Sequence, residues 1–227
     1  STGTLTFNSA PDYESKSSYF VAVTAADGVN STAQNITISV NNLNDNSPVF
    51  TSSANLSANE NQAVIGTITA SDADGNNLSY AVSGTDVSSM SINSSTGVLA
   101  FTSSPDYETK TSYTAIVTVT DGSNSTTQNI TVNVTDVDDT SPVFTSDASF
   151  TVAENQTAIG TVIATDVDTD NGSITFTVSG SELLITSGGV LSFAAAPDYE
   201  TKSSYIATVT ANDGTNSTTQ NITVSVT

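Results

Sequence analysis

Carboxylates are the side chains through which this sequence could do chemistry. The chain carries 23 Asp and Glu residues against 3 Lys and Arg, a formal net charge of −20, and it has no His and no Cys. Without His and Cys there is no Ser-His-Asp triad, no Cys nucleophile, no haem or iron–sulfur ligation and no zinc site of the usual nitrogen and sulfur type. Oxygen-rich, acidic side chains instead suit a hard cation such as Ca²⁺.

The acidic residues recur at fixed places in an internal repeat. Pro-Asp-Tyr-Glu begins at residues 11, 105 and 197, and Asp-Gly begins at residues 27, 121 and 213. Glu-Asn-Gln begins at residues 60 and 154, and Asp-x-Asp at residues 72 and 166. Taken singly, each motif is also an ordinary polar turn, as Asp121-Gly122 would be in a hairpin. Their joint recurrence in one order indicates a shared role that scattered solubilising charge would not give.

The repeats predict two and a half copies of one unit. Residues 1–47 match only the second half of a copy, residues 48–141 form one complete copy, and residues 142–227 form another. A unit of this length is too long for a solenoid repeat and has the size of a small independent domain.

Within one copy, apolar residues alternate with polar ones. Tyr113, Ala115, Val117 and Val119 share one face of a run whose other face is rich in Thr. About seven such short runs, bounded by Gly, Asn and Asp and without a helical segment, predict an antiparallel β-sandwich. An EF-hand loop beginning at Asp166 does not fit, because its Gly comes one place late and its twelfth position is not Glu.

In this order and spacing the motifs resemble the cadherin repeat, in the cadherin-like form of large bacterial surface adhesins. The resemblance covers the whole chain. The motifs that carry it are Asn44–Pro48, Pro48-Val49-Phe50, Asn59-Glu60-Asn61, Thr69–Asp74, Pro105–Glu108 and Val119–Gly122. It implies an all-β fold of tandem seven-stranded Greek-key sandwiches, cadherin- or Ig-like, in an elongated array with Ca²⁺ bound between successive domains.

The resemblance also implies which residues bind the metal. At the second linker (residues 136–140) the ligands would be Glu60, Asp106, Glu108, Asp136, Asp138, Asp139, Asp166, Asp168 and Asp213. At the first linker (residues 42–46) they would be Asp12, Glu14, Asn44, Asp45, Asn46, Asp72, Asp74 and Asp121. Nine carboxylates would hold up to about three Ca²⁺ ions, whereas Mg²⁺ would fit worse because it demands stricter geometry.

We expect the first linker to bind fewer ions, or to bind them more weakly. Its upstream Glu is absent with the missing half-copy, and Asn42 stands where the second linker has Asp136. The second linker departs from the family pattern as well, since Thr140 replaces the last Asn ligand. Asp198 and Glu200 belong to a junction whose next domain is not in this sequence, so we expect them to be vacant or weakly occupied.

The half-copy predicts an exposed apolar face. Leu5, Phe7, Tyr19, Val21 and further residues have inward parity, but their partner strands are absent from residues 1–47. Exposure would cost about 1.5–3 kcal/mol for each large side chain. Two alternatives stay open: the chain is a window from a longer polymer, or another chain completes the sandwich.

The functional hypothesis is a calcium-rigidified, extracellular stalk or filament segment of a repetitive bacterial cell-surface adhesin. Its expected partners are Ca²⁺ and neighbouring repeats of the same polypeptide or of identical chains. The negative charge argues against nucleic acid, and no apolar run approaches the about 18 residues of a membrane span. The alternative is a carbohydrate-binding or homophilic module. An enzyme is not expected, because the carboxylate pairs recur in every copy and no copy holds a unique site.

Overall fold

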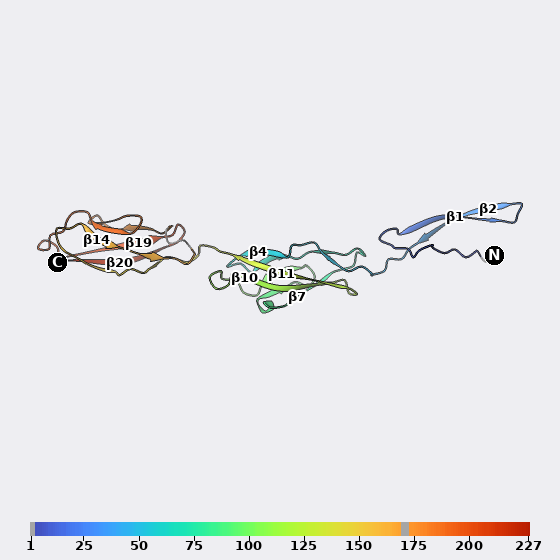
Figure 1. Cartoon of the computed structure of the whole chain (residues 1–227), viewed down its shortest axis with the longest axis horizontal. Coiled ribbons are helices and arrows are strands. Elements are labelled where there is room, and N and C mark those ends of the chain that lie inside the picture. Colours follow the sequence, from blue (N-terminus) through green and yellow to red (C-terminus); the bar gives the residue numbers. More distant parts are fainter. Residues whose placement is uncertain (1–2, 169–172) are drawn as a thin grey trace. The chain divides into compact units, whose positions relative to one another are not determined.

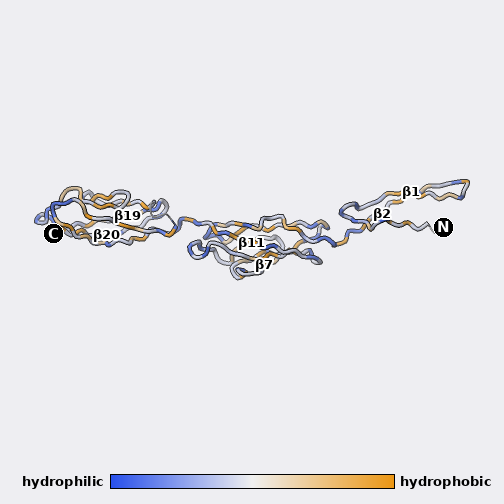
Figure 2. Tube along the Cα trace, viewed as in Figure 1, coloured by the Kyte–Doolittle hydropathy of each residue, from blue (hydrophilic) through white to orange (hydrophobic). Residues whose placement is uncertain are grey.

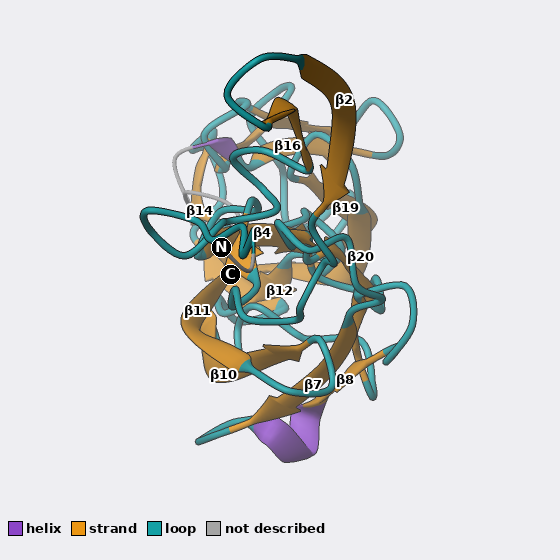
Figure 3. Ribbon diagram, turned by 90° about the vertical axis from the view of Figure 1, so that its right-hand side faces the viewer, coloured by secondary structure: helices purple, strands orange, loops and turns teal. Residues whose placement is uncertain are grey.

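The computed structural model describes residues 3–168 and 173–227. These residues fall into two compact units, one holding residues up to 106 together with 110–135, the other holding residues 107–109 and 136–227. Strands and loops dominate both units (Figure 3), and helix is limited to short turns such as η1 (Val87–Ser89). Residues 169–172, which cover most of the segment tested for an EF-hand loop, lie outside the described residues.

The first unit contains a four-stranded sheet in the order β4 (Asn55–Asn59), β11 (Ser125–Thr135), β10 (Ser112–Thr120) and β7 (Ser79–Ser83). Strand β4 runs parallel to β11, and the other neighbours are antiparallel. The long β10–β11 hairpin carries Asp121 in its turn. Strands β10 and β11 lie side by side in the sheet (Figure 1), and the turn between them holds the Asp-Gly motif.

The second sheet of this unit has the order β5 (Val64–Thr67), β9 (Val98–Phe101) and β8 (Met90–Ile92). A short pair, β3 (Val49–Phe50) with β6 (Ala70–Ser71), extends the fold beside it. The first strand of the repeat is therefore split: β3 pairs with β6, whereas β4 pairs with β11. Leu99 from one sheet and Val117 and Val132 from the other are fully buried, so the core lies between the two sheets.

The second unit repeats this arrangement. One sheet has the order β13 (Ser149–Val152), β20 (Ser217–Val226), β19 (Ser204–Asn212) and β16 (Thr175–Val178). The other has β14 (Ala158–Thr161), β18 (Val190–Phe193) and β17 (Leu183–Ile185), with β12 (Val143–Phe144) and β15 (Ala164–Thr165) beside it. Hydrophobic and hydrophilic residues alternate along these strands (Figure 2), which leaves one face of each sheet for the buried core. The predicted β-sandwich is confirmed.

Residues 3–47 form a hairpin of β1 (Ser18–Ala26) and β2 (Ser31–Ser39), which make a two-stranded sheet. Phe7 and Tyr19 pack edge to face with ring centroids 5.0 Å apart, as Phe101 and Tyr113 do at 4.9 Å. The side chains are more open here: Val23 is 39% exposed, whereas Val117 at the matching position is fully buried. Side chains that are buried in the complete copies are therefore partly exposed in the half-copy.

Candidate metal centres

Local hydrogen bonds fix each acidic turn in place. The Oδ1 atom of Asp121 accepts the backbone N–H groups of Ser123 and Asn124, both at 2.6 Å, and Asp213 repeats this with Thr215 and Asn216. In the Asp-x-Asp motifs, Oδ1 of the first Asp accepts the N–H of the second, at 3.0 Å in one copy and 2.9 Å in the other. Asp favours such turns because its short side chain can bond its own backbone.

The Glu-Asn-Gln segment is held at the opposite end of a repeat. The N–H of Glu60 donates to the carbonyl of Thr135 (3.1 Å), and that of Asn61 donates to the carbonyl of Pro105 (3.0 Å). Asn61 has φ +60°, a left-handed conformation that Asn tolerates better than most residues. The Glu60 side chain is only 2% exposed. This turn therefore places a buried carboxylate beside the start of the Pro-Asp-Tyr-Glu loop.

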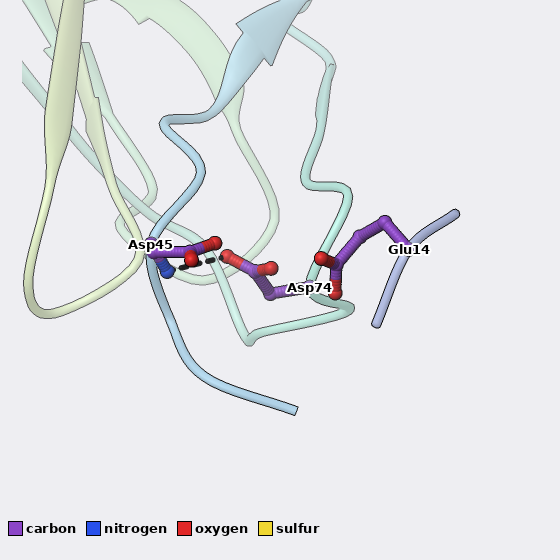
Figure 4. Close-up of side chains that lie close together, drawn as sticks. All are labelled: Glu14, Asp45 and Asp74. Carbon is purple, nitrogen blue, oxygen red and sulfur yellow. Dashed lines mark hydrogen bonds between the residues drawn. The ribbon is translucent and has the colours of Figure 1, made fainter. Parts of the chain in front are cut away.

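At the first linker, Asp74 is the centre of a hydrogen-bond network. Its carboxylate accepts the backbone N–H groups of Asp45 (3.1 Å) and Asn46 (2.9 Å), and it also accepts the Asn46 side-chain amide (2.8 Å). Glu14, Asp45 and Asp74 each offer one oxygen, and the three oxygens lie within 4.8 Å of one another (Figure 4). Three of the residues predicted for this linker are thus brought together.

The second linker repeats this cluster. Asp168 accepts the backbone N–H groups of Asp139 (3.0 Å) and Thr140 (2.6 Å). Glu108, Asp139 and Asp168 each place one carboxylate oxygen within 4.8 Å of the other two. The same three motif positions therefore form the same cluster in both units.

The second linker has a further cluster of Asp138, Asp166 and Asp213, again with one oxygen of each within 4.8 Å of the others. At the first linker the matching positions hold Asn44, Asp72 and Asp121. An amide therefore stands there in place of one carboxylate. The second linker is the richer of the two in negative charge, as the sequence predicts.

Several buried carboxylate oxygens have no hydrogen-bond donor. They include Oδ2 of Asp213, whose residue is only 8% exposed, Oδ1 of Asp168 and Oδ2 of Asp72. A buried charged oxygen without a donor is costly, by about 1–3 kcal/mol or more, unless another positive group faces it. Ca²⁺ binds oxygen ligands in flexible geometry, so an all-oxygen set of carboxylates with unpartnered atoms fits this ion.

The aspartates at these sites are held in the charged form. The hydrogen bond from the Asn46 amide, with those from the Asn46 and Asp45 backbone, keeps the pKa of Asp74 below its usual value despite desolvation. Desolvation acts to raise the pKa of Asp168, but the N–H groups of Thr140 and Asp139 outweigh it and the net shift is downward. Both carboxylates are therefore ready to bind a cation at neutral pH.

Glu14 behaves in the opposite way. Its own backbone hydrogen bond acts to lower the pKa, but desolvation, the neighbouring Asp12 and the negative charge of Asp74 outweigh it and raise the pKa above the usual value. Desolvation is the largest of the influences that raise this pKa, and the like charge of Asp74 adds to it. A cation beside Glu14 would offset the part that comes from like charge.

The remaining predicted ligands are less closely gathered. Asp12 is exposed and accepts hydrogen bonds from the Glu14 N–H (3.1 Å) and the Ser15 hydroxyl (2.7 Å), and it is not among the residues of the Glu14 cluster. Glu60 and Asp106 belong to the first unit, so their convergence with the acids of the second unit stays a prediction. The ligand role of Asp136 also stays a prediction.

Sequence reasoning did not select three residues that the structure places at these sites. One is Glu154, whose carboxylate lies with those of Asp198 and Glu200, with one oxygen of each within 4.8 Å of the others in the second unit. The match of Glu154 to Glu60 in the repeat could have identified it. The other two are Asn124 and Asn216, whose side chains contact the linkers and which recur three residues after the Asp of each Asp-Gly motif.

Tandem β-sandwiches whose linkers and turns gather carboxylates into oxygen-only clusters define a class of modular proteins with acidic linkers. Among known families, the Cadherin domain matches residues 52–135 and 148–227. The chain belongs to the cadherin family, whose domains form the extracellular parts of cell-surface adhesion proteins and are not enzymes.

Several animal relatives are similar to most of the chain. Human Protocadherin Fat 4 is 34% identical over 234 residues, which cover 92% of this chain and 5% of the relative. Human Protocadherin-11 X-linked is 36% identical over 199 residues, which cover 79% of this chain and 15% of the relative. The chain thus spans only a small part of these relatives. Since both are animal proteins, they lend no support to the predicted bacterial source.

Solved cadherin structures share the fold. The mouse Cadherin-23 EC22-24 structure aligns with a TM-score of 0.68 at 25% identity, over 97% of this chain and 78% of that one. The human Desmocollin-1 ectodomain aligns with a TM-score of 0.74 at 22% identity, over 96% of this chain and 49% of that one. These matches confirm the all-β fold and the tandem cadherin repeats. In the described part of the chain, no helix is long and apolar enough to cross a membrane.

Proposed function

We propose that this chain is a calcium-binding segment of the extracellular part of a cell-surface adhesion protein. In this proposal, cations bound at the two linkers fix the orientation of successive repeats. Cadherin domains generally bind Ca²⁺, and the family relationship supports the same property here. The domain boundaries at residues 47 and 141 are part of the proposal.

The observation that carries the proposal is the cluster of Asp138, Asp166 and Asp213. Three carboxylate oxygens lie within 4.8 Å of one another, and Asp213 is buried with its Oδ2 atom facing no donor. Two unit charges about 4 Å apart repel by about 1 kcal/mol even in water and by more near a protein surface. A positive partner would relieve this repulsion, and an oxygen-only set favours a hard cation.

A bound cation would supply charge neutralisation and cross-linking of several chain segments. The protein's own residues divide the remaining work. The N–H groups of Asp139 and Thr140 anchor the second linker to Asp168 through backbone bonds that need no metal. The carboxylates of Asp138 and Asp213 repel one another when no cation is present, which weakens this attachment of the linker.

Thermal unfolding of the full chain tests the proposal. A ligand that binds only the folded state raises stability by about 2.7 kcal/mol at a hundredfold excess over its dissociation constant. We expect a higher Tm in millimolar Ca²⁺ than in EDTA, a smaller rise with Mg²⁺, and loss of part of the Ca²⁺ effect in Asp213→Asn. Asp147→Asn, at an exposed acid outside the repeated motifs, is the matched control. An unchanged wild-type Tm on addition of Ca²⁺ would overturn the proposal.

The calcium affinity follows from the class of site. Extracellular calcium modules bind with dissociation constants of about 10⁻⁴–10⁻³ M, so occupancy of the linker sites should follow the external calcium level.

Four further features of the hypothesis stay predictions: the elongated array, the bacterial source, the filament assembly and the carbohydrate-binding alternative. The homophilic alternative has the support of the family, which forms homophilic interactions. Sedimentation of the full chain in Ca²⁺ and in EDTA would test it.

A further inference from the structure

We propose that Asn216, and Asn124 at the equivalent place, are positioning residues that fasten each linker to the hairpin carrying the buried Asp of the cation site. The inference rests on the proposed calcium function. It concerns two side-chain amides whose Nδ2 groups donate to the linkers.

At the second linker, the Asn216 amide bridges two parts of the second unit. Its Nδ2 atom donates to the Asp138 carbonyl (3.3 Å), to Asp138 Oδ1 (3.3 Å) and to the Thr140 carbonyl (3.2 Å). The backbone N–H of Asn216 also donates to Asp213 Oδ1 at 2.6 Å. One residue thus contacts both Asp138 and Asp213, two of the three acids in the cluster.

At the first linker, Asn124 makes equivalent contacts. Its Nδ2 atom donates to the Asn46 carbonyl (3.0 Å), to Asn44 Oδ1 (3.3 Å) and to Asp121 Oδ2 (3.3 Å). Its backbone N–H donates to Asp121 Oδ1 at 2.6 Å. The contact is therefore kept although the two linkers differ in sequence. Its main target is a backbone carbonyl, which any linker residue provides.

The amide completes a two-sided attachment of the linker. On one side, Asp168 accepts the N–H groups of Asp139 and Thr140. On the other side, the Asn216 amide holds the carbonyls of Asp138 and Thr140. With both sides held, the Asp138 carboxylate faces the two other acids of its cluster before any cation binds. Calcium binding then needs to order less of the linker, which lowers its entropic cost.

An amide suits this role better than a charged side chain. It supplies two donors without adding to the negative charge, and it does not compete with the cation as an ammonium group would. Neutral outer partners that orient metal ligands typically change metal affinity by about 10–100-fold when removed. We expect the loss of calcium affinity to lie near the lower end of this range, because the hydrogen bonds from Asp139 and Thr140 to Asp168 still attach the linker.

The test is the full chain with Asn216→Ala, made in a host without N-glycosylation because Asn216-Ser217-Thr218 is an acceptor sequence. Calcium binding is followed by the NMR shift of the Gly214 amide, next to Asp213. We expect the calcium dissociation constant at this site to rise about tenfold, with the fold in EDTA unchanged by circular dichroism. The matched control is Asn221→Ala, an exposed Asn on the strand that follows the turn, which accepts a hydrogen bond from the Thr208 hydroxyl.

A double-mutant cycle separates positioning from a general loss of structure. If Asn216 orients the Asp138 carboxylate, the effects of Asn216→Ala and Asp138→Asn on calcium affinity are less than additive, because the bond to Asp138 Oδ1 depends on that carboxylate whereas the bonds to the linker carbonyls remain. Additive effects of the two substitutions would overturn the inference. Equal calcium affinity in wild type and Asn216→Ala would overturn it as well, and the proposed function would stand.

Absence of calcium binding in the wild type is a different outcome, because it defeats the proposed function first. If Asn216→Ala unfolds in EDTA, Asn124→Ala carries the same test at the first linker, with the Gly122 amide as reporter. Unfolding of both variants would show that the amides serve hairpin folding and not the cation site, and the inference would fall.

Discussion

The two linkers solve one electrostatic problem in different ways. The first linker has Asn42, Asn44 and Asn46 at the positions where the second has Asp136, Asp138 and Thr140. In the first linker the Asn46 amide donates to Asp74 Oδ1, whereas the matching Oδ1 of Asp168 is buried without a donor. Neutral amides thus do at the first linker part of what a cation would do at the second.

The number of carboxylates at a linker should determine how strongly calcium stabilises it. A site with more amides is partly organised without metal, so calcium stabilises it less. In a site with more carboxylates the like charges repel one another when no metal is bound, so calcium stabilises it more. The first linker is therefore expected to respond weakly to calcium and the second strongly. The sequence indicated the same ranking from the missing upstream Glu and from Asn42 in place of Asp136.

Exchanging the acid that distinguishes the two clusters should have the largest effect. Asn44→Asp gives the first linker the same three acids as the second, and Asp138→Asn removes one from the second. Because affinity in calcium modules follows ligand charge count, we expect tighter binding in the first variant and weaker binding in the second, each by about tenfold, or about 1.4 kcal/mol. Isothermal titration of the full chain measures both. Equal calcium affinities in the wild type and both variants would contradict the proposed difference between the two linkers.

Removing calcium should affect the two linkers unequally. The backbone N–H groups of Asp139 and Thr140 donate to Asp168, and those of Asp45 and Asn46 donate to Asp74. We expect EDTA to speed amide hydrogen exchange several-fold more at the second pair than at the first, because the empty second site is more strongly repulsive. The core amides of β11 serve as the internal reference. Equal acceleration at both linkers would contradict the ranking.

Much of this architecture could be predicted from the sequence because it rests on periodicity. Alternation along residues 113–119 gives the buried face of β10, and recurrence of Asp-x-Asp and Asp-Gly identifies Asp168 and Asp213. The Asn46–Asp74 bond could not be predicted, since it depends on how the linker folds back over a turn 28 residues away. The split of the first strand between two sheets was missed too, because residues 51–54 carry no distinctive turn signal.

The contacts of Asn124 and Asn216 were hidden for a related reason. An Asn after Asp-Gly is common in hairpin turns whatever its side chain does. Only the three-dimensional position of the linker carbonyls separates a turn residue from one that bonds the linker. The repeat showed that the Asn recurs but did not show what it contacts.

Converting Thr140 to the residue of the first linker should have a moderate effect. Thr140→Asn would offer Asp168 Oδ1 the amide donor that Asn46 gives Asp74. We expect the chain in EDTA to gain roughly 1 kcal/mol of unfolding free energy, the net worth of a typical hydrogen bond, and the stabilisation by calcium to shrink. Urea denaturation with and without Ca²⁺ measures both. The control is Thr145→Asn, at an exposed position outside the linker. If it raised the unfolding free energy by the same amount, the gain in Thr140→Asn would not come from a bond to Asp168.

The smallest expected effect comes from acid. The pKa values of Asp74 and Asp168 are lower in the folded state than the reference value of 3.8. A depressed folded pKa contributes stability that is fully present above the unfolded pKa and is lost as pH falls through the folded pKa. In EDTA, the stability difference between wild type and Asp74→Asn should therefore be constant from about pH 5 upward and shrink below about pH 4.

Asp168→Asn should follow the same course with a smaller difference. Two N–H groups hold Asp168, whereas Asp74 also accepts the Asn46 amide. The largest influence on the pKa of Asp168 is desolvation, which opposes the shift, whereas the largest influence on the pKa of Asp74 is the Asn46 amide, which favours it. Denaturation midpoints of the wild type and both variants between pH 2.5 and 7 measure the two curves. If the Asp168 difference were the larger, the amide at residue 46 would not be what organises the first linker without metal, and the contrast between the linkers would rest on ligand charge alone.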